Sequence, residues 1–309
     1  MAESLSLPKY NSPSVDRTLY QQGVGSLMYG MISTWPNIAY ATGLLAQHAA
    51  NPGKEHWSAL LQVLRYLQAT KDLGIVYDSS KNSELIGFVD ADYAGDPHTS
   101  RSTTGWTFIL AGGAIAWSLR KQPTISLSST EAKYVAAASA AREILWIRSF
   151  LSELGFLTNG PTALLTNNQS SIALAKNPSN HQNTKHIRVK YHFIRELIAF
   201  KEIELKFIPT NEQVANVLTK PLGRLKFPKF ITDMGSLVSE IGPCMPVCLH
   251  GWACRHDVEC NWRVRDARAE DPEAEGGREE NTVSALLGEA ATDLVKAGFL
   301  GSVLVLGLV

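Results

Sequence analysis

Four polar residues stand where a predicted strand ends or a predicted helix begins: Asp90, Glu131, Asn167 and Asn216. Asp90 follows the apolar residues 86–89, a pattern typical of a buried strand that carries an acid to the edge of a sheet. Asp92 would share its face, because strand side chains alternate. Taken alone, this stretch is better explained as a strand that runs into a polar turn, where Asp and Gly are common. Strand ends and helix starts meet at one edge of an α/β sheet, so the four positions can converge there.

The first part of the chain is predicted to be a layer of helices. Apolar residues at helical spacing begin at Leu19, and Pro36 opens a second segment that reaches residue 48. Asn51-Pro52-Gly53 breaks the pattern, and a third helix is predicted over 55–69. An apolar stripe of this kind is most often core packing, so this layer shows no chemistry of its own.

After Gly74 the pattern changes to strands followed by mixed elements. Strands are predicted over 75–77, 85–89, 103–110 and 114–119. The short turns between three or four of these neighbouring strands indicate an antiparallel meander. Later elements are predicted as a helix over 130–154, a strand over 162–166, helices over 168–176 and 186–201, a strand over 203–208 and a short helix opened by Thr210-x-x-Gln213. The order predicts a mixed α/β layer fold with a central sheet. Ser128-x-x-Glu131 fits a capping box at the start of the long helix.

The composition is that of an ordinary globular protein. The 309 residues are 45% hydrophobic and 19% charged, with a formal net charge of zero. The net charge therefore gives no indication of a nucleic-acid partner. The start of the chain lacks the pattern of a signal peptide, and residues 1–243 contain no cysteine. We expect an intracellular, cytoplasmic protein, with the nucleus left open.

The tail differs from the body. Residues 266–280 are acidic and polar, a composition that predicts disorder. The apolar residues 294–309 are interrupted by Lys296 and are fewer than the roughly 20 that a membrane span needs, so no membrane partner is expected. All four cysteines lie here, at Cys244, Cys248, Cys254 and Cys260. Only the first pair has the tight spacing of a zinc site, so a zinc-linked interaction protein is a minor alternative.

Six strings occur in a fixed order: FVDADYAGD at 88–96, KQPT at 121–124, LSSTEA at 127–132, NQSSIA at 168–173, TKHI at 184–187 with YHF at 191–193, and VLTKPL at 217–222. Together they resemble the ribonuclease H domain that ends the polyprotein of copia-type retrotransposons. Residues 18–70 resemble the helical segment after the polymerase core. The predicted organisation is an extended leader 1–17, a helical segment 18–72, a ribonuclease H-like domain 73–225 and an unrelated, partly disordered tail 226–309. The fold class implied is α/β, a ribonuclease H-like mixed sheet flanked by helices and preceded by a small helical layer.

The resemblance implies Mg²⁺-dependent hydrolysis of the RNA strand in RNA·DNA hybrids. Two Mg²⁺ ions activate water and steady the leaving oxygen, and they prefer oxygen ligands. By resemblance, Asp90 would be shared by both metal ions and Glu131 would bind the first. The implied partners are the RNA·DNA hybrid and the reverse transcriptase core.

Two of the four expected carboxylates are amides here. The family has aspartate where this chain has Asn167 and Asn216. At an effective dielectric of about 20, a unit charge 4 Å from a cation is worth roughly 4 kcal/mol per unit charge. We therefore expect poor metal occupancy and weak or absent cleavage. Alternatively, Asn167 is a helix N-cap and Asn216 a polar helix position. Nothing in the sequence indicates whether Asp92 and Asp96 compensate.

Further departures point in the same direction. The family usually has Asp at Asn37 and Glu at Lys133. Asp to Asn and Glu to Lys each follow from one G-to-A change in a codon, and the four departures suggest a decaying copy. The hypothesis can be tested on the nucleotide sequence and on intact relatives.

A locally basic region offers contacts to a nucleic-acid backbone. The candidate substrate-binding residues are Arg120, Lys121, Lys185, His186 and Arg188. A solvated helix face explains the same charges equally well. The alternatives that stay open are an active hybrid ribonuclease and a non-catalytic nucleic-acid-binding remnant.

Overall fold

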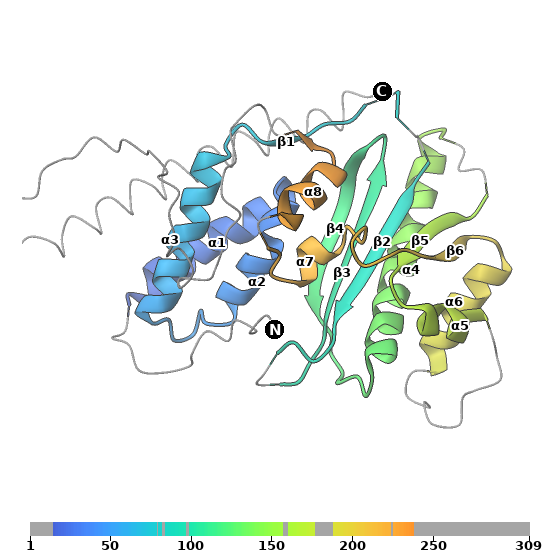
Figure 1. Cartoon of the computed structure of the whole chain (residues 1–309), viewed down its shortest axis with the longest axis horizontal. Helices are drawn as coiled ribbons and strands as arrows, with labels where there is room; N and C mark the ends of the chain where they lie inside the picture. Colours follow the sequence, from blue (N-terminus) through green and yellow to red (C-terminus); the bar gives the residue numbers. More distant parts are fainter. Residues whose placement is uncertain are drawn as a thin grey trace, which may run out of the picture.

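The protein is described here from a computed structural model that covers residues 15–78, 80–81, 84–96, 99–156, 160–176, 188–223 and 225–237. Its centre is a five-stranded mixed sheet with the strand order β4-β3-β2-β5-β6 and helices on both faces (Figure 1). The predicted fold class is therefore confirmed. No helix among these residues is long and apolar enough to cross a membrane. The predictions for the leader 1–14 and for the cysteine-containing tail lie outside the described residues.

The sheet brings four strand ends to one edge. β2 (Ile86–Asp92), β3 (Thr103–Leu110) and β4 (Gly113–Lys121) form the predicted antiparallel meander. β5 (Thr162–Thr166) runs parallel to β2, and β6 (Ile203–Phe207) runs parallel to β5. Since β2 and β4 are both antiparallel to β3, the last residues of β2, β4, β5 and β6 lie at the same edge.

One face of the sheet is covered by α4 (Ser129–Glu153), with α5 (Gln169–Lys176) and α6 (Arg188–Ala199) beside it. Small residues of α4 are fully buried against the strands, among them Ala136, Ala140 and Ala141. Their small side chains allow the helix to approach the sheet closely, and Phe108 and Leu164 fill the space on the strand side. This packing fixes the rotation of α4 and hence the direction of each of its side chains.

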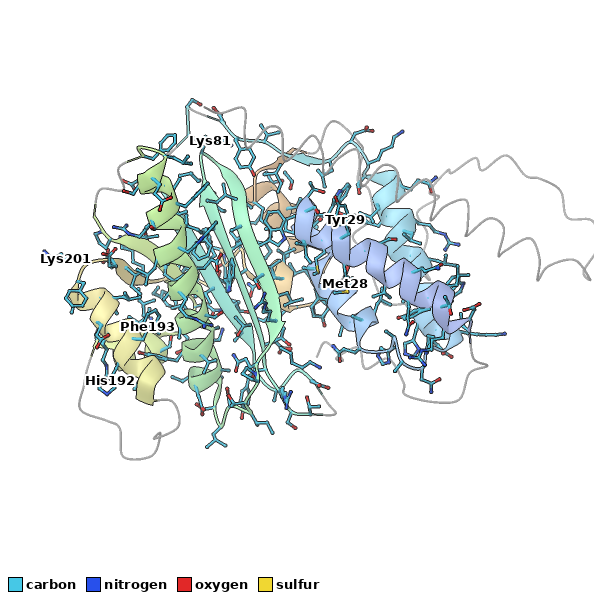
Figure 2. The ribbon with its side chains drawn as sticks, turned by 180° about the vertical axis from the view of Figure 1, so that it is seen from behind. Met28, Tyr29, Lys81, His192, Phe193 and Lys201 are labelled. Atoms are coloured by element: carbon cyan, nitrogen blue, oxygen red, sulfur yellow. The ribbon has the colours of Figure 1, made fainter. Side chains whose placement is uncertain are left out.

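The other face carries the helical layer, which comprises α1 (Arg17–Ser33), the 3₁₀ turn η1 (Pro36–Ile38), α2 (Ala39–Ala46) and α3 (Lys54–Ala69). Between the layer and the sheet lie α7 (Asn216–Thr219) and α8 (Lys226–Asp233). The Trp117 indole N–H of β4 donates to the Met31 carbonyl of α1 over 2.7 Å. Figure 2 shows the outer side of α1, where Met28 and Tyr29 are exposed. The helical layer therefore contacts the sheet directly at β4 and otherwise packs on it through α7 and α8.

Two predicted boundaries need revision. β1 (Gly74–Ile75) does not join the meander but pairs with β7 (Ser236–Leu237) in a separate two-stranded ribbon. The folded body also continues past residue 225, because Phe230, Ile231 and Met234 are buried. The Ala114 amide donates to the Met234 carbonyl over 2.9 Å, which ties this segment to β4. Residues 226–237 match none of the family strings, which is why the sequence predicts them as part of the tail.

Candidate functional site

Asp90 lies near the end of β2 and is 1% exposed. The last paired residues of β2 and β5 are Phe88 and Leu165. Two residues farther along the chain lie Asp90, still in β2, and Asn167, directly after β5. The parallel register therefore sets these two side chains next to each other, as the sequence predicted for strand ends at one sheet edge.

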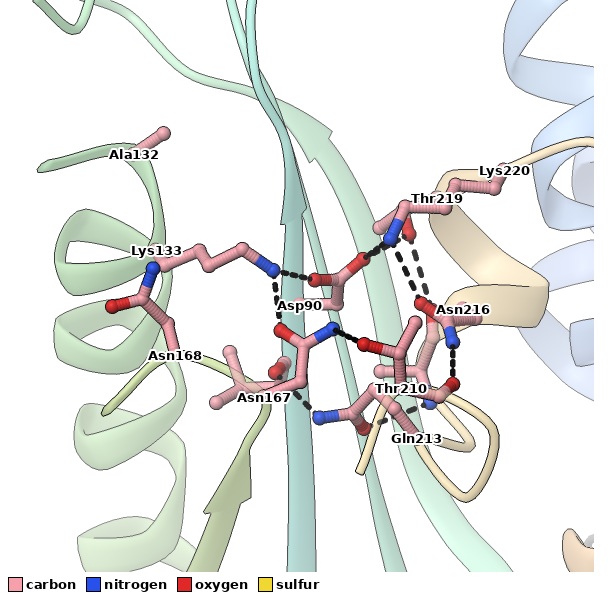
Figure 3. A network of polar contacts seen from close by, with 12 residues as sticks. Asp90, Ala132, Lys133, Asn167, Asn168, Thr210, Gln213, Asn216, Thr219 and Lys220 are labelled. Atoms are coloured by element: carbon pink, nitrogen blue, oxygen red, sulfur yellow. Dashed lines mark hydrogen bonds and ion pairs between the residues drawn. The ribbon is translucent and has the colours of Figure 1, made fainter. Parts of the chain in front are cut away.

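Two lysine side chains hold the Asp90 carboxylate from opposite sides (Figure 3). The Lys133 ammonium of α4 donates to Asp90 Oδ1 over 2.5 Å. The Lys220 ammonium, which follows α7, lies 2.8 Å from Asp90 Oδ2. The Thr219 hydroxyl also donates to Oδ2, over 2.8 Å. Three donors, one from α4 and two from the end of α7, thus contact the Asp90 carboxylate.

The two lysine ammonium groups also donate to the side-chain amides of Asn167 and Asn216, which stand where the family has aspartate. Lys133 donates to Asn167 Oδ1 as well as to Asp90. Lys220 donates to Asn216 Oδ1 over 3.0 Å. The Lys133 ammonium therefore lies between Asp90 and Asn167, and the Lys220 ammonium lies between Asp90 and Asn216 (Figure 3).

The lysines control the ionisation of Asp90. Burial raises the pKa of this carboxyl, because the charged form is poorly solvated inside the protein. Lys220 and Lys133 together outweigh burial, and the pKa of Asp90 lies below its ordinary value. Asp90 is therefore an ionised carboxylate whose charge is neutralised by ammonium groups.

Glu131, the predicted ligand of the first metal ion, lies in the cap of α4. The Ser128 hydroxyl accepts from the Glu131 amide over 3.1 Å, and Glu131 Oε2 accepts from the Leu127 amide over 2.8 Å. Residues 131 and 133 differ by about 200° around a helix. Since Lys133 faces Asp90, the Glu131 side chain points elsewhere. The predicted bond between the Glu131 amide and the Ser128 hydroxyl, one of the two bonds of a capping box, is confirmed. The role of Glu131 as a metal ligand stays a prediction.

The segment 210–216 supports the network from below in Figure 3. Asn167 Nδ2 donates to the Thr210 hydroxyl over 3.2 Å, and Asn216 Nδ2 donates to the Thr210 carbonyl over 2.8 Å. Gln213 is fully buried and donates to the carbonyls of Val89 (3.0 Å) and Leu165 (3.2 Å). The predicted Thr210-x-x-Gln213 helix start is therefore wrong: Gln213 bridges β2 and β5, and α7 begins only at residue 216.

The alternative explanation of Asn167 as a helix N-cap is also wrong. Asn168 has that role, because its Oδ1 accepts from the Ser171 amide over 2.6 Å in the first turn of α5. Asn167 instead belongs to the polar network around Asp90. The sequence could not separate these adjacent asparagines, since both precede the same helix.

The two other acids of the opening stretch have surroundings of their own. Asp96 is paired with Lys121 over 2.7 Å and accepts from the Thr99 hydroxyl. The Asp92 carboxylate lies over the backbone of Gly95, where a Cβ would come within 1.5 Å of Asp92 Oδ2. Burial raises the pKa of Asp92, and the Asp90 carboxylate adds to this effect, against the opposing charges of Lys220 and Lys133. Burial, and to a smaller extent the charge of Asp92, raises the pKa of the Tyr40 phenol of α2 to about 12.

The predicted substrate-binding residues are only partly described. Arg120 is exposed near the end of β4, at the same edge of the sheet as Asp90, and Lys121 beside it is engaged by Asp96. Lys185 and His186 lie outside the described residues, and Arg188 begins α6 without a described side chain.

The donor set does not fit a pair of Mg²⁺ ions. The spaces between Asp90 and the two amide oxygens are occupied by ammonium groups, and Asp90 is the sole carboxylate in this network of described side chains. Across all described residues, no group of three or more His, Cys, Asp or Glu side chains is placed to hold a metal ion. A divalent cation prefers several oxygen ligands and is repelled by ammonium groups, so this site as built is unsuited to it.

The lysines were the residues that sequence reasoning missed in this site. Lys133 was noted only as a departure from the family, and Lys220 only as part of a matching string. Their separation of 87 residues along the chain gives no indication that the two side chains are close in space. The angle of about 200° between positions 131 and 133 of a helix could have indicated that only one of them faces Asp90.

Comparisons with known proteins agree with the resemblance. No family model matches the chain. The Retrovirus-related Pol polyprotein from transposon TNT 1-94 of Nicotiana tabacum is 43% identical over 208 residues, which are 67% of this chain and 16% of the relative. The Retrovirus-related Pol polyprotein from transposon RE2 of Arabidopsis thaliana is 38% identical over 236 residues, 76% of this chain and 16% of the relative. The chain thus spans about one-sixth of the length of these polyproteins.

Among solved structures, LC11-RNase H1 in complex with an RNA/DNA hybrid is 12% identical and matches 42% of this chain and 88% of that chain, with a TM-score of 0.33. The sequence relatives and the mixed five-stranded sheet described above identify the chain as a member of the copia-type retrotransposon Pol polyproteins, of which it is a region with a ribonuclease H-like fold.

Proposed function

We propose that this region binds RNA·DNA hybrids and cleaves their RNA strand weakly or not at all. One observation carries the proposal: Asp90 is enclosed by the ammonium groups of Lys133 and Lys220. The family reaction needs divalent cations at clustered carboxylates. Two unit charges of the same sign at 4 Å repel by roughly 4 kcal/mol at an effective dielectric of about 20. A cation entering beside Asp90 has to displace these ammonium groups.

We further propose that position 133, rather than 131, is a carboxylate position of the metal site in intact relatives. The family usually has Glu at this position, and the side chain at 133 reaches both Asp90 and Asn167. The side chain at 131 instead reaches back to the Leu127 amide. In this assignment three of the four expected carboxylates are replaced, by Lys133, Asn167 and Asn216.

A cleavage assay on matched variants tests the proposal. The wild type, Asn167→Asp/Asn216→Asp, and the triple variant that adds Lys133→Glu are incubated with a labelled RNA·DNA hybrid, first with Mg²⁺ and then with Mn²⁺. The triple variant is expected to cleave at least about tenfold to a hundredfold faster than the double variant, a range associated with changes around metal ligands. Adding Asp90→Asn to the triple variant should abolish the gain.

Rapid cleavage by the wild type that is lost in Asp90→Asn would establish the active ribonuclease instead. No gain in a folded triple variant would show that the proposed metal-site positions are wrong. Binding is measured separately, with Arg120→Ala as a test of the basic edge of the sheet. Association with a reverse transcriptase core and an intracellular location stay predictions.

A further inference from the structure

The two ammonium groups at Asp90 have the geometry of a binding site for an anion. We propose that Lys133 and Lys220 bind a phosphodiester of the nucleic-acid backbone directly, with no divalent cation. This inference rests on the hybrid binding proposed above and adds the chemistry by which the site makes the contact.

Each ammonium has a hydrogen-bond donor left for a ligand. A lysine ammonium carries three N–H groups. Lys133 uses two of them, on Asp90 Oδ1 and Asn167 Oδ1. Lys220 uses two, on Asp90 Oδ2 at 2.8 Å and Asn216 Oδ1 at 3.0 Å. The described residues supply no third acceptor to either group, so one N–H of each is available to a phosphate oxygen.

The lysines, and not Asp90, are accessible to an incoming anion. The Asp90 side chain has no exposed surface, whereas the side chains of Lys133 and Lys220 are 13% and 36% exposed. An approaching phosphate therefore meets the lysine side chains before the carboxylate. Asp90 holds the two groups in place from behind, and this preorganisation lowers the entropy cost of binding.

The charge of the site favours a phosphate. Among the five side chains joined by these contacts, two ammonium groups face the Asp90 carboxylate and the amides at 167 and 216 are neutral, which leaves one positive charge in excess within this set. Two further acids lie nearby. The pKa of Asp92 is affected first by burial and then by the charges of Lys220, Asp90 and Lys133, and Glu131 Oε2 accepts from the Leu127 amide. The site therefore presents to a phosphate the charge that metal ions supply in a carboxylate site.

Hybrid binding at several salt concentrations tests this inference. The dissociation constant of a fluorescent RNA·DNA hybrid is measured in EDTA and in Mg²⁺ at matched ionic strength, for the full chain and for Lys133→Met and Lys220→Met. The wild type is expected to bind equally well in EDTA. Each variant should weaken binding several-fold and lower the slope of log affinity against log salt by about 1, as expected for the loss of one phosphate contact.

Two further variants control for folding and for general charge. Lys133→Arg keeps the positive charge and should retain most of the slope. Lys71→Met removes an exposed lysine that follows α3 and should leave binding unchanged. Thermal unfolding of every variant establishes that it is folded.

Binding that requires Mg²⁺, or a wild-type salt slope in both folded methionine variants, would overturn the metal-free contact while leaving hybrid binding as proposed. Absence of binding under all conditions would overturn both proposals.

Discussion

Asp90 has a different electrostatic role here from that of a carboxylate in a cluster of acids. In such a cluster the acids repel one another until cations bind, so each acid destabilises the empty site. Here Asp90 is ionised, buried and surrounded by donors from Lys133, Lys220 and Thr219. The carboxylate therefore contributes to the stability of the fold.

Replacement of Asp90 by Ala should accordingly destabilise the protein. Removal of one partner from a buried ion pair costs about 3–5 kcal/mol, and the lower end is expected because Lys220 is about one-third exposed. Urea unfolding in EDTA measures the change. Glu204→Ala, which removes a surface ion pair with Lys206, should cost no more than about 1 kcal/mol. A gain in stability for Asp90→Ala would show that the lysines do not hold the carboxylate.

At the start of α4, two side chains two residues apart have different tasks. Lys133 reaches across to β2 and β5, and Glu131 completes the cap of the helix. The same turn thus ends the loop before α4 and supplies the group that faces Asp90. α4 packs closely on the sheet through its alanines, and this packing fixes the rotation of the helix. Glu131 and Lys133 therefore cannot exchange positions relative to Asp90.

Glu131→Gln separates the two roles. In the triple variant Lys133→Glu/Asn167→Asp/Asn216→Asp, we expect cleavage to persist when Glu131→Gln is added. The measured cost should appear in stability, at about 1 kcal/mol or less, as for a weakened cap. Loss of cleavage without loss of stability would assign the metal role to Glu131 after all.

The start of α3 contains a buried histidine that makes the helical layer sensitive to pH. His56 Nδ1 accepts from the Gly53 amide over 2.8 Å, and its ring stacks on His48 with the centroids 3.9 Å apart. His56 Nε2 is buried and has no hydrogen-bond partner among the described residues. Burial lowers the pKa of His56, against an opposing effect of Glu55.

The sign of the pH dependence follows from that shift. Because the pKa of His56 is lower in the folded state, the unfolded chain binds the proton more readily. The contribution of His56 to the free energy of unfolding should be constant well above pH 6.5 and should fall as the pH drops below about 6.5, by at most about 1.4 kcal/mol per pH unit. Urea unfolding at pH 7.5 and 5.5 measures the fall. His56→Gln should reduce it, whereas His192→Gln, at an exposed position on α6, should not.

The helical layer is joined to the sheet through α7 and α8, which lie on the face opposite α4. α7 carries Thr219 and leads into Lys220, and α8 fills the space between the helical layer and β4. Phe230 and Met234 lie in one hydrophobic cluster with Ala39 of α2 and Ala114 of β4. The residues at Asp90 and the helical layer are thus parts of one packed structure.

A comparison of two shortened variants tests this packing. A chain that ends at residue 237 keeps α8 and β7, and a chain that ends at 225 loses both. The shorter chain should be less stable by several kcal/mol, since burial of each large apolar side chain contributes about 1.5–3 kcal/mol. Thermal unfolding and limited proteolysis measure the difference. Equal melting temperatures would place the boundary at 225, as the sequence first suggested.

Local patterns in the sequence were enough to predict most helices and strands. They also predicted that residues 90 and 167 lie close together at one edge of the sheet. Apolar periodicity depends on neighbours within a few residues, so the meander, the long helix and both parallel strands could be predicted. The capping residue Ser128 could be predicted for the same reason. The strand-end rule also indicated that Asp90 and Asn167 share one sheet edge.

Contacts between distant residues lay beyond these patterns. The pattern that predicts α4 does not say how the helix is rotated against the sheet, and that rotation places Lys133, and not Glu131, at Asp90. Lys220 contacts the same carboxylate although it lies 130 residues farther along the chain. Gln213 was predicted at a helix start, but its side chain donates to the backbones of β2 and β5. These side chains are positioned by packing across the whole sheet. Tertiary structure alone therefore shows a carboxylate held between two ammonium groups, where the resemblance had implied metal ions.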